Sequence, residues 1–219
     1  MQLTQSQVQD DVRFWLNQDR EHALFYLLGL RDPQLQAQAA RIHGAYEEAL
    51  GRDDLRRGLQ ILQQSQALKQ VLMRESRRRF IGWLFPDFYD HTWRELDVML
   101  RRIRPGGISA RDELCEGNLM NAEHAAFAAH LLDPVERPLV DAANNASKQA
   151  GQIAAGCMST VYPTLVTLSR QAGTAIDRFA KDALPGAQSI VHPVLLAHVQ
   201  REGERFLSTL DRLPMQDAA

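Results

Sequence analysis

Two adjacent Glu-His pairs interrupt apolar segments of the sequence, and both residue types are common ligands of transition metals. Glu21 and His22 lie in REHALFYLLGLRDP, and Glu123 and His124 lie in the similar segment NAEHAAFAAHLLDP. Residues three, four or seven positions apart share one face of a helix. A phenylalanine stands four residues after each of the two glutamates. We therefore expect both glutamates on buried, apolar helix faces.

A second motif, His-x-x-x-Glu, lies late in each half of the chain. His91 and Glu95 lie in DHTWRELDVML, and His198 and Glu202 lie in LAHVQREGERFL. In a helix this spacing directs the two side chains toward one place. A buried carboxylate without a partner costs several kcal/mol, and a divalent or trivalent metal ion can compensate it. Carboxylate oxygen and neutral imidazole nitrogen suit iron, manganese or zinc.

The predicted metal ligands are drawn from these eight residues: Glu21, His22, His91, Glu95, Glu123, His124, His198 and Glu202. Adjacent residues lie about 100° apart around a helix, so one member of each Glu-His pair could bind the ion while the other orients the binding side chain. A hydrogen-bonded Glu/His network without metal is the alternative interpretation. A single His-x-x-x-Glu is commonly a solvated ion pair, so it is the recurrence of both motifs in the same order that favours metal.

The order of the motifs predicts an internal repeat. The second Glu-His pair follows the first by 102 residues, and the second His-x-x-x-Glu follows the first by 107. The segment RPGGIS at 104–109 separates two parts of similar length. We therefore predict two domains, residues 1–105 and 106–219, each a four-helix unit.

Good helix formers dominate the sequence, and no stretch shows the sustained two-residue alternation of a strand. We predict an all-α fold, in which Asp32-Pro33 and Asp133-Pro134 each begin a helix with an N-cap followed by proline. The eight expected helices cover about 5–30, 33–50, 54–79, 87–103, 110–132, 134–154, 160–183 and 190–212.

The overall charge and the two cysteines limit the class of protein. A formal net charge of -2 gives no general attraction to nucleic acid or anionic membranes. No apolar run approaches the roughly 20 residues that span a bilayer. Cys115 and Cys157 form no CxxC motif, which argues against a thiolate metal site and against a disulfide framework. The start of the chain is polar and acidic, unlike a secretory signal, so we expect a cytoplasmic protein with reduced cysteines.

The segments FWLNQDREHALF, AEHAAFAAHLLDP and HVQREGERFL resemble those of a poorly characterised bacterial group with duplicated ferritin-like halves. The resemblance covers nearly the whole chain and implies two tandem ferritin-like four-helix bundles related by an internal repeat. It also implies metal binding at the eight positions named above. The better-known di-iron pattern needs Glu-x-x-His, which this sequence lacks, so a mononuclear site with an open position is easier to build here.

The leading hypothesis is a metalloprotein whose iron or manganese site, with zinc as a further candidate, activates oxygen as a non-haem oxidase or oxygenase, or serves redox chemistry. Its candidate partners are the metal ion, dioxygen, a small-molecule substrate and a second copy in a homodimer, with neither nucleic acid nor a membrane. The competing hypothesis is a metal-free helical interaction or scaffold protein. Tyr46 lies in the expected helix 33–50, and the residue 102 positions later, in the second half, is Lys148. If this helix contributes a redox tyrosine, only the first half has it. Whether one half or both bind metal therefore stays open.

Overall fold

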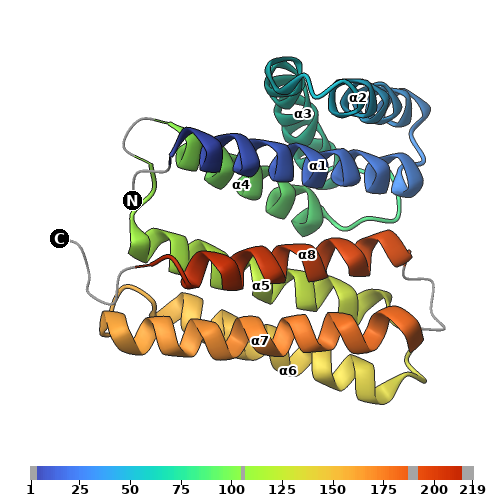
Figure 1. The fold of residues 1–219 in the computed structure, drawn as a ribbon. Coiled ribbons are helices and arrows are strands. Elements are labelled where there is room, and N and C mark those ends of the chain that lie inside the picture. The colour runs from blue at the N-terminus through green and yellow to red at the C-terminus, as the bar shows by residue number, and fades with distance from the viewer. Residues whose placement is uncertain (1–3, 105–106, 187–191, 214–219) are drawn as a thin grey trace. The chain divides into compact units, whose positions relative to one another are not determined.

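The chain forms eight α-helices and no β-strand over the residues that the computed structural model describes, 4–104, 107–186 and 192–213 (Figure 1). The predicted all-α fold with eight helices is confirmed. Residues 105, 106, 190 and 191, which belong to the expected break and to the expected start of the last helix, lie outside the described residues. The helices are α1 (Gln5–Gly29), α2 (Pro33–Gly51), α3 (Leu55–Ser76), α4 (Pro86–Ile103), α5 (Ala110–Leu131), α6 (Arg137–Gly156), α7 (Tyr162–Gly186) and α8 (Pro193–Leu210).

The helices group into two compact units, Met1–Gly107 and Ile108–Ala219. In the first unit α1 contacts α2, α3 and α4, and in the second unit α5 contacts α6, α7 and α8. The first helix of each unit, like the third, therefore packs against the three others, so residues on its inner faces meet side chains from several helices.

Local capping residues set the starts of several helices. The Thr4 side chain accepts a hydrogen bond from the Gln7 backbone N–H, and the Thr4 backbone N–H donates to the Gln7 side chain, which forms a capping box at the start of α1. Asp32 caps α2 and is followed by proline at the first helical position, as predicted. The same prediction for Asp133 is wrong, because α6 begins three residues later than expected. Asp133 instead closes a turn, in which its carbonyl accepts a hydrogen bond of 2.8 Å from the Glu136 backbone.

The connection between α3 and α4 packs against the junction of α1 and α2. Leu30 and Gly82 form an isolated antiparallel bridge, and the backbone N–H of Trp83 donates to the carbonyl of Gly29 over 2.8 Å. A Cβ atom on Gly82 would lie 2.3 Å from the Gly29 carbonyl oxygen. Only glycine permits this backbone approach, which anchors the chain immediately before α4.

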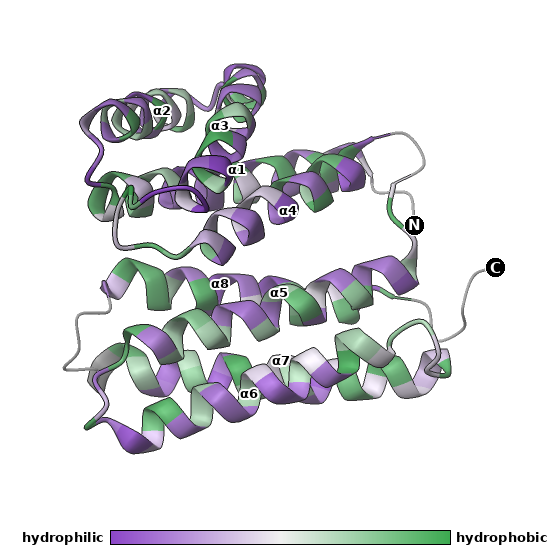
Figure 2. Ribbon diagram, turned by 180° about the vertical axis from the view of Figure 1, so that it is seen from behind, coloured by the Kyte–Doolittle hydropathy of each residue, from purple (hydrophilic) through white to green (hydrophobic). Residues whose placement is uncertain are grey.

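The two cores differ in composition, although every helix mixes hydrophobic and hydrophilic residues (Figure 2). The first unit buries large aromatic side chains completely, among them Tyr26, Tyr46 and Tyr89. The second unit buries mainly small and aliphatic side chains, including Ala146 and Ala150 on α6. The distance between packed helices depends on the side chains at the contact, so small residues let helix backbones approach more closely than large ones do.

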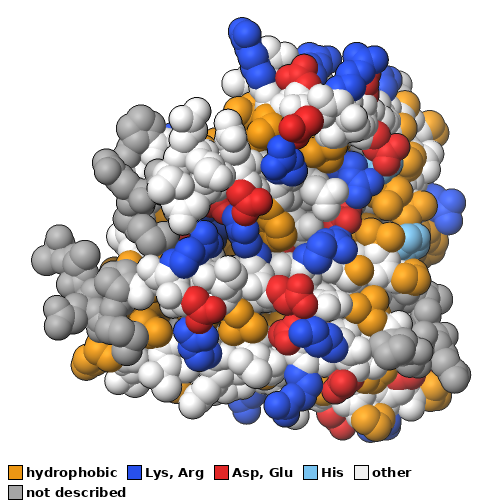
Figure 3. All heavy atoms as spheres, viewed as in Figure 1, with side chains coloured by type: hydrophobic (Ala, Val, Ile, Leu, Met, Phe, Trp, Pro, Cys, Tyr) orange, Lys and Arg blue, Asp and Glu red, His pale blue; other side chains and the backbone are white. Residues whose placement is uncertain are grey.

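Charged side chains of both signs are interspersed on the face drawn in Figure 3. Several pairs lie one helical turn apart, as in the hydrogen bond of 2.8 Å from Arg94 to Asp90. Among the described residues, none of the helices combines the length and apolar character that a bilayer-spanning segment requires.

A disulfide joins Cys115 on α5 to Cys157 at the end of α6, and their Cα atoms lie 5.6 Å apart. The expectation of reduced cysteines is therefore wrong. The pairing spans 42 residues without a CxxC motif, so it becomes visible only once α5 packs on α6. Cys157 is at the same time a fully buried core residue.

Candidate metal centres

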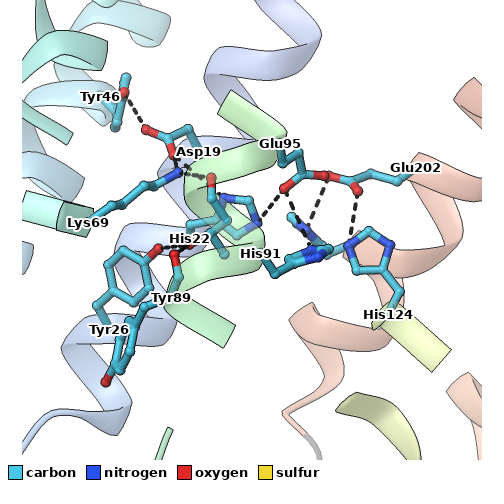
Figure 4. Close-up of polar contacts among 12 residues, drawn as sticks. Asp19, His22, Tyr26, Tyr46, Lys69, Tyr89, His91, Glu95, His124 and Glu202 are labelled. Carbon is cyan, nitrogen blue, oxygen red and sulfur yellow. Dashed lines mark hydrogen bonds and ion pairs between the residues drawn. The ribbon is translucent and has the colours of Figure 1, made fainter. Parts of the chain in front are cut away.

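The first unit brings two histidines and one glutamate together between α1 and α4. His22 projects from α1, and its Nε2 atom lies 3.2 Å from Oε2 of Glu95 on α4 (Figure 4). The Nε2 atom of His91, one turn before Glu95, lies 3.9 Å from the same oxygen. All three side chains are buried, with relative exposures of 1–3%. One carboxylate oxygen thus faces two imidazole nitrogens out of contact with bulk water.

The second unit contains the same three residue types on its own first and last helices. His124 on α5 and His198 on α8 each place Nε2 at 3.2 Å from Glu202, one on Oε2 and the other on Oε1. The two imidazole rings meet edge to face, with centroids 5.8 Å apart. Glu202 is 6% exposed, and the two histidines are buried more deeply.

These distances suit the coordination sphere of a transition metal. Ligand atoms bind such ions at about 2.0–2.2 Å, so two neighbouring ligands of one ion lie about 3–3.5 Å apart. Nε2 atoms at 3.2 Å from a glutamate oxygen, in both units, fall in this interval. Buried histidines and glutamates among these residues could therefore hold a metal ion. The donor set, two imidazoles and one carboxylate, is the one that non-haem Fe(II) sites use.

The glutamates of the two Glu-His pairs occupy different places. Glu21 is buried, with 4% exposure, and its Oε1 atom lies 3.5 Å from Nη2 of the adjacent Arg20. Glu123 is partly exposed. Neither belongs to the groups of close ligand atoms, whereas the histidine of each pair does. The structure therefore brings together His22, His91 and Glu95 in one unit and His124, His198 and Glu202 in the other.

Behind His22, the first unit holds a buried polar network centred on Asp19. Figure 4 shows the Asp19 carboxylate between Tyr46, Lys69 and His22. The Tyr46 hydroxyl donates to Oδ2 over 2.6 Å, and the Lys69 ammonium donates to Oδ1. The Nδ1 atom of His22 lies 3.5 Å from Oδ1. Lys69 also donates to the backbone carbonyl of Thr92 over 2.8 Å, so the network connects all four helices of the unit.

The charges of this network compensate one another. Burial alone would raise the pKa of Asp19, but Lys69 and His22 outweigh it and hold this pKa well below its usual value. Asp19 is therefore ionised at neutral pH. Burial, followed by the Asp19 carboxylate, raises the pKa of Tyr46, which stays a neutral hydrogen-bond donor. Removing either charge would leave the other buried alone.

The sequence contained a partial sign of this network. Lys69 occupies a position on the buried face of α3, which otherwise carries small and apolar residues such as Ser65 and Leu72. A lysine on such a face needs an anionic partner. The sequence does not say which of the many carboxylates that partner is, because Asp19 lies 50 residues earlier.

A small cavity adjoins the network in the first unit. Its volume of about 10 Å³ is close to the minimum that accommodates one water molecule. The Nε1 atom of Trp15 is buried without a hydrogen-bond partner among the described residues. Polar and apolar side chains together line the cavity: Trp15, Gln18, Asp19, His22, Lys69, Glu95, Leu96 and Met99.

The second unit has a different environment behind its histidine. Asn121 precedes His124 by three residues, as Asp19 precedes His22. The Phe206 ring packs over two glycines, because a Cβ atom would lie 2.2 Å from the ring at Gly117 and 3.2 Å from it at Gly173. An aromatic ring therefore fills the space between α5, α7 and α8.

Comparisons with known proteins relate the chain to uncharacterised proteins. No family model matches the sequence. An uncharacterised protein of Acanthamoeba polyphaga mimivirus is 22% identical, over 95% of this chain and 82% of the viral protein. The crystal structure of an uncharacterised protein from Bacillus cereus G9241 superposes with a TM-score of 0.86, covering 98% of this chain and 95% of that chain at 15% identity. The fold is thus shared along nearly the full length of an experimentally determined structure.

Proposed function

We propose that the protein is a ferritin-like metalloprotein in which each unit binds one iron or manganese ion through two histidines and one glutamate. The supporting observation is the convergence of two buried Nε2 atoms on one buried carboxylate in each unit. The ligands are His22, His91 and Glu95 in the first unit and His124, His198 and Glu202 in the second.

The ligand set favours a redox-active ion with room for a further ligand. Three protein donors leave positions open on an ion that prefers five or six, and imidazole with carboxylate suits iron and manganese, with zinc as a competitor. Such an ion supplies redox chemistry with dioxygen or peroxide when bound. The surrounding protein keeps bulk water away, because all six ligand side chains are buried.

We further propose that the two units are copies of one ferritin-like four-helix bundle. The buried positions of α3 support this, because each has a buried counterpart on α7 after 104 residues. The four buried positions of α6 each follow a buried position of α2 by the same spacing, so Tyr46 pairs with Ala150 and not with Lys148. The α3 positions are Gly58, Ile61, Leu62, Ser65, Leu68, Lys69 and Leu72, and their counterparts are Tyr162, Leu165, Val166, Ser169, Ala172, Gly173 and Ile176.

Metal analysis tests the proposal directly. Protein purified without chelators should carry about one ion per unit and gain thermal stability on addition of Fe(II) or Mn(II). Glu95→Gln should remove the ion of the first unit, and Glu202→Gln that of the second. Glu123→Gln, which alters a carboxylate outside the groups, is the matched control and should keep full metal content. A metal content below about a tenth of an equivalent, with no stability gain from Fe(II), Mn(II) or Zn(II), would refute the function.

A metal-free scaffold is the second candidate, and one observation favours it. Separations of 3.2 Å between imidazole nitrogen and carboxylate oxygen also suit direct hydrogen bonds. In that case Glu95→Gln should be tolerated, since a neutral amide can replace the carboxylate in a hydrogen-bond network, and added metal should change nothing. Loss of bound metal in this variant would exclude the scaffold interpretation.

A further inference from the structure

The two histidines contributed by α1 and α5 have different partners beside their second ring nitrogen. The Nδ1 atom of His22 faces the Asp19 carboxylate at 3.5 Å, one helical turn earlier on α1. The residue at the corresponding step before His124 is Asn121, whose Nδ2 atom has no hydrogen-bond partner among the described residues. A carboxylate thus stands where the second unit has a neutral amide.

Asp19 is held firmly in this position. The Tyr46 hydroxyl and the Lys69 ammonium occupy its two oxygens, and Lys69 is itself fixed by the Thr92 carbonyl at 2.8 Å. Asp19 is 3% exposed and Lys69 is fully buried. The carboxylate is therefore shielded from solvent, and its two hydrogen bonds keep it from rotating away from His22.

We propose that Asp19 is a positioning residue that fixes His22 with Nδ1–H toward Asp19 and Nε2 toward Glu95, and that it makes the first-unit centre the tighter metal site. The inference rests on the proposed function. A neutral imidazole carries its proton on one nitrogen, and a carboxylate beside Nδ1 selects the tautomer whose Nε2 lone pair is free for an ion. The same carboxylate makes the imidazole a stronger electron donor.

Co(II) titration measures the effect on affinity, because its absorption bands report binding. His198→Ala removes a ligand of the second unit, so binding in this background reports the first centre. Asp19→Asn alone would leave the Lys69 ammonium buried without an anion, so the test variant combines Asp19→Asn with Lys69→Met. We expect Co(II) affinity to fall by about 10- to 100-fold, the usual effect of removing such a partner.

The matched control lies in the second unit. In a His91→Ala background, which weakens the first centre, Asn121→Ala should change Co(II) affinity by less than about threefold, since a neutral amide contributes little to an imidazole ligand. If Asn121→Ala lowers the Co(II) affinity as much as Asp19→Asn with Lys69→Met does, the proposal is overturned. Each centre would then need only a polar residue three positions before its histidine, and not a carboxylate.

A measurement on metal-free protein separates positioning from general stability. Nitrogen-15 spectra of labelled histidine should show His22 as the Nδ1–H tautomer in the wild type and as a mixture in the Asp19→Asn, Lys69→Met variant. An unchanged tautomer or an unchanged Co(II) affinity in this variant overturns the role of Asp19. If the wild type binds no Co(II), the proposed function fails instead, and the metal-free spectra still decide whether Asp19 positions His22.

Discussion

The two units bring together the same three residues, two histidines and one glutamate, but surround them differently. In the first unit the histidine on α1 is backed by Asp19, Lys69 and Tyr46, which are buried and mutually bonded. In the second unit the Phe206 ring packs against Gly117 and Gly173, between α5, α7 and α8, and Asn121 stands three residues before His124. The ligand geometry thus persists while its surroundings change from an ionic network to apolar packing.

This difference shows that convergence of the ligands does not depend on the network behind them. His124 and His198 reach Glu202 at 3.2 Å without a buried lysine nearby on α7, where Gly173 occupies the corresponding position. The helix positions of these histidines and glutamates therefore fix where they meet, and on the proposed function the surrounding residues set how strongly they bind the ion.

All three tryptophans, Trp15, Trp83 and Trp93, belong to the first unit, so tryptophan fluorescence reports its unfolding alone. The largest effect is expected from Lys69→Met, which leaves the Asp19 carboxylate buried without its cation. Breaking such a pair costs about 3–5 kcal/mol in free energy of unfolding, and urea denaturation followed by fluorescence should detect it.

Adding Asp19→Asn to Lys69→Met should restore most of that stability, because no buried charge then lacks a partner. If the single and double variants lose stability equally, the effect comes from packing of the lysine side chain and not from its charge.

The next effect concerns the disulfide of the second unit. Replacing Cys115 and Cys157 by alanine removes a cross-link that spans 42 residues. We expect a loss of about 2–4 kcal/mol from the second unit, measured by far-UV circular dichroism. The fluorescence transition of the first unit serves as the internal control, since that unit contains no cysteine. A shift of both transitions by the same amount would contradict the assignment.

A smaller effect is expected from Gly117→Ala on α5. The new methyl group would lie 2.2 Å from the Phe206 ring, and overpacking of this kind costs about 1–3 kcal/mol. Gly151→Ala is the matched control in the same unit, because its methyl group would make an ordinary contact of 3.7 Å with Ala122. This control should stabilise the helix slightly. Calorimetry that found both variants equally stable would show that the ring can move aside.

The sequence predicted the helices well because their signals are local. Apolar periodicity and capping residues act within a few positions, and the expected helices agree with α1 to α8 apart from shifts at their ends. The start of α6 was missed because Asp133-Pro134 suits a turn as well as a helix start, and Glu136 takes the capping position instead. The disulfide could not be foreseen, because a separation of 42 residues carries no local signal.

Most of the recurring histidines and glutamates lie close together in the structure, whereas the sequence said little about their environment. The His-x-x-x-Glu spacing is a property of one helix, so the approach of His198 to Glu202 follows from the sequence. The choice between Glu21 and His22 depends on helix rotation, which only packing fixes. The network around Asp19 joins residues from four helices, and none of its members is adjacent in sequence to another.

The ring of Phe206 limits how one arrangement could be converted into the other during evolution. A Cβ atom would lie 2.2 Å from the ring at position 117 and 3.2 Å from it at position 173, and on the proposed repeat these positions correspond to Trp15 and Lys69. If the two units are copies of one bundle, as proposed, no single replacement leads from one arrangement to the other through a well-packed intermediate. On that proposal their divergence required several coordinated changes, which resist reversal once made.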